Sequence, residues 1–274
     1  MNFTAPPRQL RGIALPGLKP ITSLPCDRCV GRSLNLCKPL DDTRLRRLLA
    51  LGSMRHWKRH ETLFRAGDPM TSFFKIRKGI VAVSRALDDG RRQIVAVRAP
   101  GDCVGYLDND GKYAFEGEAL TDVEACAFDR RGFDAFAGDH PDLAAAVTEA
   151  LSSALKQTGQ AMLVLGQLKA TERVAHFLCE IDALYRQRHI GGTPLVLHMS
   201  RSEIGDYLGL TAETVSRNMG KLKKRGLIGL VGADGVVVLE DAKLREVGKV
   251  TADRVSSDVG FQQADRRRIR VPRA

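Results

Sequence analysis

The segment from His198 to Leu239 constrains the fold most, because it has the pattern of two short helices joined by a tight turn and followed by a hairpin. Ser200 and Glu203 are spaced as a capping box, so a helix is expected to begin directly after Ser200. Gly209 is expected to end this helix, since glycine adopts the left-handed backbone of a sharp turn at little cost. This spacing predicts the first helix of a helix-turn-helix.

A second helix is expected over residues 212–225, with Thr211 as its N-cap. Its apolar stripe consists of Val215, Met219 and Leu222. Two short apolar runs, 227–231 and 236–239, flank a turn and predict a β-hairpin after the helix. The unit is therefore expected to be a winged helix-turn-helix, whose second helix enters the major groove of DNA. A helical hairpin with a solvated basic face is the alternative.

The outer face of the second helix carries side chains suited to reading DNA. Arg217 has a planar guanidinium that can donate to the O6 and N7 atoms of guanine, and Glu213 can accept from the amino group of cytosine. Ser216 is small enough to allow close approach to a base. Lysines on this face suit contacts with phosphates. The candidate DNA-binding residues are Thr211, Glu213, Ser216, Arg217, Lys221 and Lys224.

Three of the cysteines form a C-x2-C-x7-C pattern near the N-terminus, at Cys26, Cys29 and Cys37. Clustered thiols in a protein without a secretion signal indicate a metal or redox site rather than a disulfide framework. Three thiolates are one short of a tetrahedral zinc site or a four-iron cluster. From spacing alone, the fourth ligand is one of Cys103, Cys126, Cys179, His56 and His60. Three unrelated thiols on a flexible loop are the alternative.

The middle of the chain changes from strand-like to helical periodicity. After a short amphipathic helix at 41–52, short apolar runs alternate with turn signals from Glu61 to Phe136, which predicts a β-sandwich or jelly roll. One of these runs alternates apolar and basic side chains, Phe74 and Ile76 against Lys75 and Arg77.

A long helix follows, with an apolar seam at alternating spacings of four and three residues. The seam residues are Val147, Leu151, Ala154, Thr158, Ala161, Leu165 and Leu168. A helix of about 28 residues spans about 40 Å, which is too long for one small domain to cover. We therefore expect this helix to pair with a second copy of the chain. A core helix within one subunit is the alternative.

Taken together, these patterns predict an α+β protein with six segments. They are a flexible tail (1–24), a cysteine loop (25–40), a β-roll sensor domain (41–138), a dimerisation helix (139–169), a DNA-binding domain (170–245) and a basic tail (246–274).

Composition narrows the class of function. The formal net charge of +11 favours a polyanionic partner such as DNA. We expect no membrane span and no signal peptide, because the apolar runs are too short, and a cytoplasmic location is therefore the expectation. The sequence shows no glycine-rich phosphate loop and no convincing nucleophile–base pair, so an enzyme is not expected.

The order of these segments resembles the Crp/Fnr family of bacterial transcription regulators over about residues 25–245. The matching segments are ETLFRAGD, the PGD at 100–102 and IGDYLGLTAETVSR. Within that family the chain is most similar to the oxygen-sensing Fnr branch, whose recognition helix carries E-x-x-S-R. Here this motif is Glu213, Ser216 and Arg217.

The resemblance implies a cyclic-nucleotide-binding-like β-roll and a homodimer that binds double-stranded DNA at a TTGA-type inverted repeat in low oxygen. It also implies that a roll loop, the turn from Leu87 to Arg91, contacts RNA polymerase. An activator of anaerobic or microaerobic genes is the expected role. The residues after Gly101 lack the phosphate cradle of the cyclic-AMP-binding members, and the histidines do not favour a haem.

The Fnr branch holds an oxygen-labile [4Fe-4S] cluster on three N-terminal cysteines and one in the roll. The resemblance places this cluster on Cys26, Cys29, Cys37 and Cys126, the last within EALTDVEACAFDR. Cys103, in GDCVGY, is the second choice for the roll ligand. A structural zinc ion, or an empty loop in a regulator that answers another effector, is the alternative.

Overall fold

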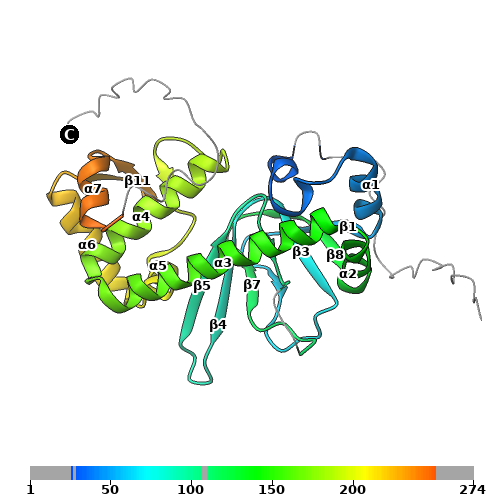
Figure 1. Cartoon of the computed structure of the whole chain (residues 1–274). Helices are drawn as coiled ribbons and strands as arrows, with labels where there is room; N and C mark the ends of the chain where they lie inside the picture. The colour runs from blue at the N-terminus through cyan, green and yellow to red at the C-terminus, as the bar shows by residue number, and fades with distance from the viewer. Residues whose placement is uncertain (1–25, 27–28, 107–109, 251–274) are drawn as a thin grey trace, which may run out of the picture.

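The computed structural model describes residues 26, 29–106 and 110–250. Figure 1 shows a β-roll on one side, a mostly helical unit on the other, and one long helix that runs beside both. The predicted N-terminal tail and residues 251–274 of the predicted C-terminal tail lie outside the described residues.

The roll consists of two four-stranded sheets with antiparallel pairing, which confirms the predicted jelly-roll-like core. The first sheet has the order β1 (Gly52–Trp57), β8 (Val123–Asp129), β3 (Ser72–Lys78) and β6 (Cys103–Val104). The second has the order β2 (Thr62–Phe64), β7 (Glu116–Ala119), β4 (Val81–Ala86) and β5 (Arg92–Arg98).

Aromatic side chains fill the space between these two sheets. The rings of Phe64 and Tyr113 lie 4.6 Å apart, and those of Phe64 and Phe74 lie 5.8 Å apart. Phe64, Phe74 and Tyr113 are all buried, in one cluster with Ile76 of β3. The roll interior is thus packed with apolar side chains.

The outer face of the first sheet is covered as well, by segments from the N-terminus and by helices. They are η2 (Val30–Ser33), η3 (Asn35–Cys37), α1 (Asp42–Ala50), α2 (Arg130–Gly138) and the start of α3 (Pro141–Gln167). Along β3, Phe74 and Ile76 alternate with Lys75 and Arg77 as expected, but the face that carries Lys75 is not open to solvent. Lys75 is only 3% exposed, because the cysteine loop lies over it. A strand whose two faces are both covered buries both sets of side chains.

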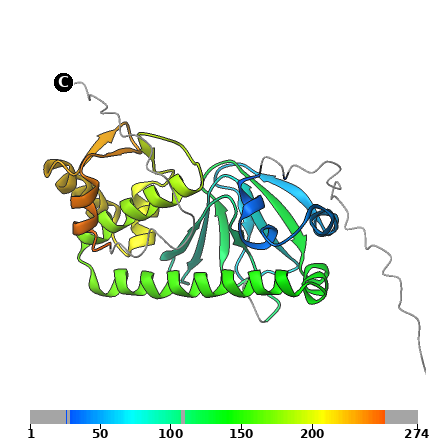
Figure 2. The same ribbon diagram turned by 45° about the horizontal axis from the view of Figure 1, so that its top comes forward.

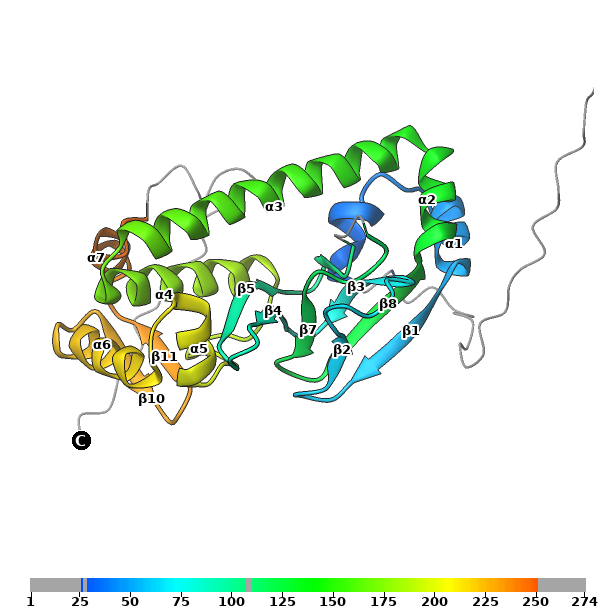
Figure 3. The ribbon, with the colours of Figure 1, turned by 90° about the horizontal axis from the view of Figure 1, so that it is seen from below.

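Helix α3 connects the two halves and lies along one side of the molecule (Figure 2). Proline at its N-terminus is tolerated, because the first turn has no N–H partner to lose. The helix is anchored near its two ends, where Leu143 and Val164 are buried. Figure 3 shows α4 (Ala170–Gln187) running back beneath the second half of α3.

The C-terminal unit has the predicted winged helix-turn-helix. After α4 its elements are β9 (Leu195–Val196), α5 (Arg201–Leu208), α6 (Ala212–Lys224), β10 (Ile228–Val231), β11 (Gly235–Val238) and α7 (Asp241–Val247). The Ser200 hydroxyl accepts from the N–H of Glu203 at 3.1 Å, and the Glu203 carboxylate accepts from the N–H of Ser200 at 2.6 Å. Gly209 has a φ of 62°, as the turn requires.

Two elements of this unit were not predicted. Strand β9 pairs with β11 and makes the wing three-stranded. Helix α7 moves the end of the folded unit from the predicted residue 245 to at least 250, because the Gly248 carbonyl accepts from His176 Nδ1 at 2.8 Å and Val250 packs on the core. The predicted basic tail therefore begins later than residue 246.

Candidate functional site

One face of the recognition helix α6 packs on the core of the DNA-binding unit, and the opposite face is exposed. The Thr211 hydroxyl caps it by accepting from the N–H of Thr214 at 3.2 Å. The predicted stripe of Val215, Met219 and Leu222 is buried. All six candidate DNA-binding residues are exposed, on the side of the helix away from this stripe. The geometry thus presents a polar, mostly basic helix surface of the kind that fits a major groove.

Arg217 lies at the middle of that surface. Its Nε is 3.7 Å from Glu213 Oε1, and the two side chains are 64% and 78% exposed. An exposed ion pair one helical turn apart contributes only about 0.3–0.5 kcal/mol. The guanidinium of Arg217 is therefore free to exchange this partner for a base.

The buried Asn218 and the half-buried Arg173, which the sequence patterns did not single out, fix α6 and α5 relative to their neighbours. Asn218 accepts from Thr171 Oγ1 of α4 at 2.6 Å. Arg173 of α4 donates to the carbonyls of Leu165, Leu168 and Leu208 at 2.5, 2.9 and 3.0 Å. A cation there complements the C-terminal ends of α3 and α5. Arg173 thus joins the long helix to the DNA-reading unit.

Four cysteines gather at the outer face of the first sheet. Cys26, Cys37 and Cys126 are 8%, 8% and 9% exposed and belong to one buried cluster, while Cys29 is half-buried. Burial and the neighbouring thiols of Cys37, Cys29 and Cys26 raise the pKa of Cys126 to about 12. Burial and the thiols of Cys37 and Cys29 raise the pKa of Cys26 to about 11. The three loop cysteines and Cys126 thus face a common site.

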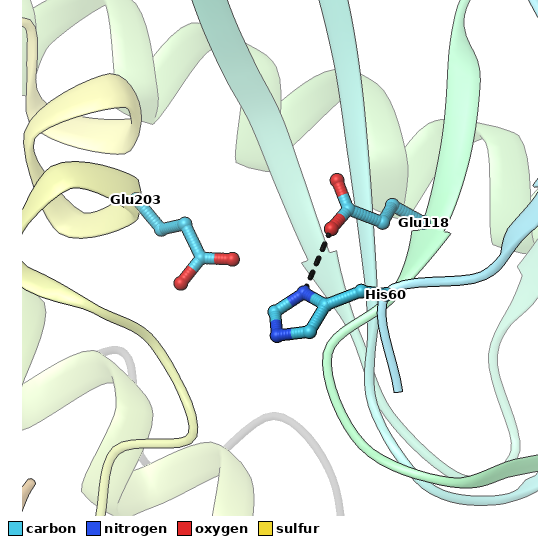
Figure 4. Close-up of side chains that lie close together, drawn as sticks. All are labelled: His60, Glu118 and Glu203. Atoms are coloured by element: carbon cyan, nitrogen blue, oxygen red, sulfur yellow. Dashed lines mark hydrogen bonds and ion pairs between the residues drawn. The ribbon is translucent and has the colours of Figure 1, made fainter. Parts of the chain in front are cut away.

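The other candidate ligands differ in position. Cys103 lies on β6, at the rim of the same cluster, and burial raises its pKa to about 12 with a smaller effect from Cys37. Cys179 is buried in the core of the DNA-binding unit, in a different cluster. His56 lies on β1 and pairs across the sheet with Glu124. His60 lies near Glu118 and Glu203, where the second sheet meets α5 (Figure 4).

The spacing of the cysteine Sγ atoms can be compared with the spacing that a bound metal ion requires. A tetrahedral zinc ion with four Zn–S bonds of about 2.3 Å holds its sulfurs about 3.8 Å apart. Within residues 26, 29–106 and 110–250, no three cysteine Sγ atoms lie within 4.8 Å of one another. The described thiols are thus not gathered as tightly as the ligands around a zinc ion would be. The donor set, four thiols with low exposure, suits an iron–sulfur cluster.

The cysteine loop is tied to the roll by hydrogen bonds to its backbone and from its side chains. Asn35 Nδ2 donates to the Gly101 carbonyl at 2.8 Å. Arg32 donates to the carbonyls of Cys37 and Leu40 at 2.7 and 2.8 Å, which closes the loop on itself. Helix α3 lies against this loop, since Leu143 is in the same buried cluster as Cys26 and Cys37.

His60, Glu118 and Glu203 bring side chains from the roll and the DNA-binding unit together (Figure 4). His60 Nδ1 lies 3.1 Å from Glu118 Oε1. Both carboxylates already have partners, because Glu118 binds the Arg92 guanidinium at 2.7 Å and Glu203 accepts from the N–H of Ser200. Arg92 also lies 3.3 Å from Asp206 of α5. We interpret the group as part of an ion-pair network between the two units, since the guanidinium disfavours a metal cation there.

The turn that was expected to face RNA polymerase joins β4 and β5. The N–H of Leu87 donates to the Arg91 carbonyl at 2.7 Å, and the Leu87 side chain is 54% exposed. The turn is thus a projecting hairpin tip, available to a partner. In the described part of the chain, no helix is long and apolar enough to cross a membrane.

Comparison with known proteins agrees with both halves of this architecture. Residues 54–140 match the model of the cyclic nucleotide-binding domain, and residues 172–247 match the Crp-like helix-turn-helix domain. The nitrogen fixation regulation protein FixK of Bradyrhizobium diazoefficiens is 36% identical over 80% of this chain and 92% of its own length. The transcriptional activator protein FnrL of Cereibacter sphaeroides is 33% identical over 81% of this chain and 90% of its own.

A solved structure shows the same fold. FixK2 from Bradyrhizobium japonicum superposes with a TM-score of 0.67 at 32% identity, covering 73% of this chain and 99% of its own. The two family models match the roll and the winged helix-turn-helix in this order along the chain, and the long helix α3 lies between them. The chain is a DNA-binding transcription regulator of the Crp/Fnr family.

Proposed function

We propose that the chain is a homodimeric, oxygen-responsive regulator with a [4Fe-4S] cluster on Cys26, Cys29, Cys37 and Cys126. The observation that carries this proposal is the core that Cys26, Cys37 and Cys126 share with the start of α3, with Cys29 close enough to raise the pKa of Cys26 and Cys126. Bound there, the cluster would supply a group whose integrity depends on oxygen. A structural zinc ion on the same thiols is the alternative.

A dimer through α3 is supported by the apolar side chains that this helix leaves exposed. Leu151, Leu155 and Met162 are 40%, 73% and 70% exposed. These positions lie on one helix face, since spacings of four and seven residues return to the same side. An exposed apolar stripe along a long helix is typical of a pairing surface.

The stripe is rotated relative to the seam predicted from the sequence. Of the predicted positions, Leu151 and Thr158 are exposed, whereas the others are half-buried against their own subunit, namely Val147, Ala154, Ala161, Leu165 and Leu168. Leu155 and Met162 were not in the predicted seam. The helix has apolar residues on two adjacent faces, and periodicity alone does not tell which face the roll covers. We therefore centre the proposed dimer interface on Leu155.

Coupling between the cysteine site and the dimer interface follows from packing. Leu36 and Cys37 of η3 share a buried cluster with Leu143, and Val147 packs against it one turn further along α3. Arg44 of α1 also holds Asp142, at the start of α3, at 2.5 Å. A change in how the cysteine loop packs therefore acts on the N-terminal end of α3. The C-terminal end of this helix is held to the DNA-reading unit by Arg173. A few kcal/mol of coupling suffices to switch a two-state population.

DNA recognition is proposed through two copies of α6 placed one turn of DNA apart. Arg217 would donate to a guanine, Glu213 would accept from a cytosine, and the lysines would bind phosphates, on a TTGA-type inverted repeat. The relatives described above are a nitrogen fixation regulation protein and a transcriptional activator, which supports a role in gene control. We further propose that the turn from Leu87 to Arg91 contacts RNA polymerase and that the protein acts in the cytoplasm.

The ligand set is tested by the variant Cys126→Ala. Protein prepared without oxygen and supplied with iron and sulfide is expected to lose its bound iron and the broad absorption near 400 nm. Cys179→Ala is the matched control, because Cys179 is also buried but lies in the other core, and this variant should retain both signals. Cys103→Ala should also retain them. Loss of iron in Cys103→Ala with retention in Cys126→Ala would overturn the assignment, and colourless wild-type protein that binds zinc would overturn the cluster itself.

A further inference from the structure

Lys75 lies in the middle of the cysteine site although it is not a cysteine ligand. In the first sheet it pairs with Cys103 of β6 on one side and with Cys126 of β8 on the other. Residues directly opposite each other on neighbouring strands point to the same face. Cys103, Lys75 and Cys126 therefore form one row across three strands, beneath the cysteine loop.

The ammonium of Lys75 holds that loop directly. Its Nζ donates to the Gly31 carbonyl at 2.9 Å and to the Leu34 carbonyl at 2.7 Å. Gly31 permits this approach, because a Cβ there would lie 3.0 Å from Lys75 Cε and 3.2 Å from Gly101 Cα. Both carbonyls lie in the segment between Cys29 and Cys37, so Lys75 fixes the part of the loop that carries two of the three thiols.

The burial of the Lys75 charge also needs a physical reason. A lysine that is 3% exposed is costly unless its charge is compensated. The Gly31 and Leu34 carbonyls that accept from it are neutral, so they satisfy hydrogen bonds but not charge. A group of negative charge held on the surrounding thiols would complete the pairing.

We propose that Lys75 is a positioning residue that keeps the cysteine loop docked on the roll whether or not a cluster is bound. Cys29 and Cys37 then remain facing Cys126 after the cluster is lost, in a site ready to be reloaded. The part of this inference that concerns the cluster rests on the proposed function, whereas the docking of the loop does not. Loss of the cluster accordingly changes packing at the base of α3 without releasing the loop.

The test compares two proteins in two states, the wild type and Lys75→Met, each with and without iron and sulfide. Hydrogen–deuterium exchange of the amides over residues 29–40 reports docking of the loop. Without iron, we expect these amides to exchange at least about tenfold faster in Lys75→Met than in wild type, because charge-assisted hydrogen bonds are lost. With the cluster assembled, we expect the variant to regain most of the protection, since the thiolate ligands then hold the loop.

Lys78→Met is the matched control, because Lys78 is on the same strand but exposed, and it should exchange as wild type does. Amides of β3 and β8 report whether the variant is folded. If Lys75→Met fails to fold, Lys75→Gln provides the same comparison, since its shorter side chain is polar but does not reach both carbonyls.

Equal loop exchange in wild type and Lys75→Met without iron would overturn the inference. So would a wild-type loop that is unprotected until the cluster is assembled. A wild-type protein that takes up no cluster would contradict the proposed function, while the comparison without iron would still decide the role of Lys75.

Discussion

Replacing Arg217 by alanine is expected to abolish the discrimination between the inverted repeat and a site in which the guanine of each half is replaced. A bidentate arginine–guanine contact contributes about 1–3 kcal/mol, and a dimer makes it twice. Arg217 is exposed at the middle of α6 and is held by a weak ion pair with Glu213 and a 3.4 Å hydrogen bond to the Thr214 hydroxyl, so its loss removes base contacts without unfolding the helix. Fluorescence anisotropy with the two DNA duplexes measures the ratio of the affinities.

Lys221→Ala is the control for this prediction. Lys221 is exposed on the same helix, one turn further along, and is expected to bind phosphate. Its loss should weaken binding to both duplexes by a similar factor and reduce the dependence of affinity on salt. If Arg217→Ala keeps the wild-type ratio of affinities while binding more weakly, Arg217 binds phosphate and the assignment of direct base reading is wrong.

The second large effect is expected from Leu155→Glu, which should convert the dimer to monomers. Leu155 is 73% exposed in one subunit and lies at the middle of the apolar stripe on α3. Burying a leucine contributes about 1.5–3 kcal/mol, and a dimer related by a two-fold axis would lose this contribution twice. Two carboxylates facing each other in an apolar seam add repulsion and a desolvation cost. Sedimentation equilibrium measures the shift to monomer.

Leu87→Glu is the matched control, because Leu87 is also exposed but lies at the tip of the β4–β5 hairpin. This variant should remain as dimeric as wild type. Leu155→Glu should also lose affinity for the inverted repeat, because a monomer has one α6 helix and contacts only one half-site. A Leu155→Glu protein that sediments as the wild type does would place the interface elsewhere on the chain.

Local signals in the sequence predicted the DNA-reading unit well. The capping box at Ser200 and the left-handed turn at Gly209 depend on neighbours three or four residues away, and both are present as expected. Strand β9 and helix α7 were missed because each is short and gains its stability from distant partners. Two residues of β9 pair with β11, and α7 packs against α4.

Sequence patterns predicted only part of the cysteine site. Spacing identified the three loop cysteines, but the position of the fourth thiol depends on strand register. That register places Cys126 and Cys103 on either side of Lys75. The burial of Lys75 was not predicted, because alternation along a strand does not reveal that a loop from the N-terminus covers the second face. For the same reason, the exposed stripe of α3 differs from the predicted seam.

The most direct test of the account is to measure dimerisation and DNA binding of one anaerobic sample, with iron and sulfide assembled, before and after air is admitted. The visible spectrum is recorded at the same time. We expect a brown dimer that binds the inverted repeat, followed within minutes by loss of the absorption near 400 nm, a shift toward monomer and weaker binding. Unchanged dimerisation and DNA binding after the absorption has gone would contradict the central claim that the cysteine site controls the long helix.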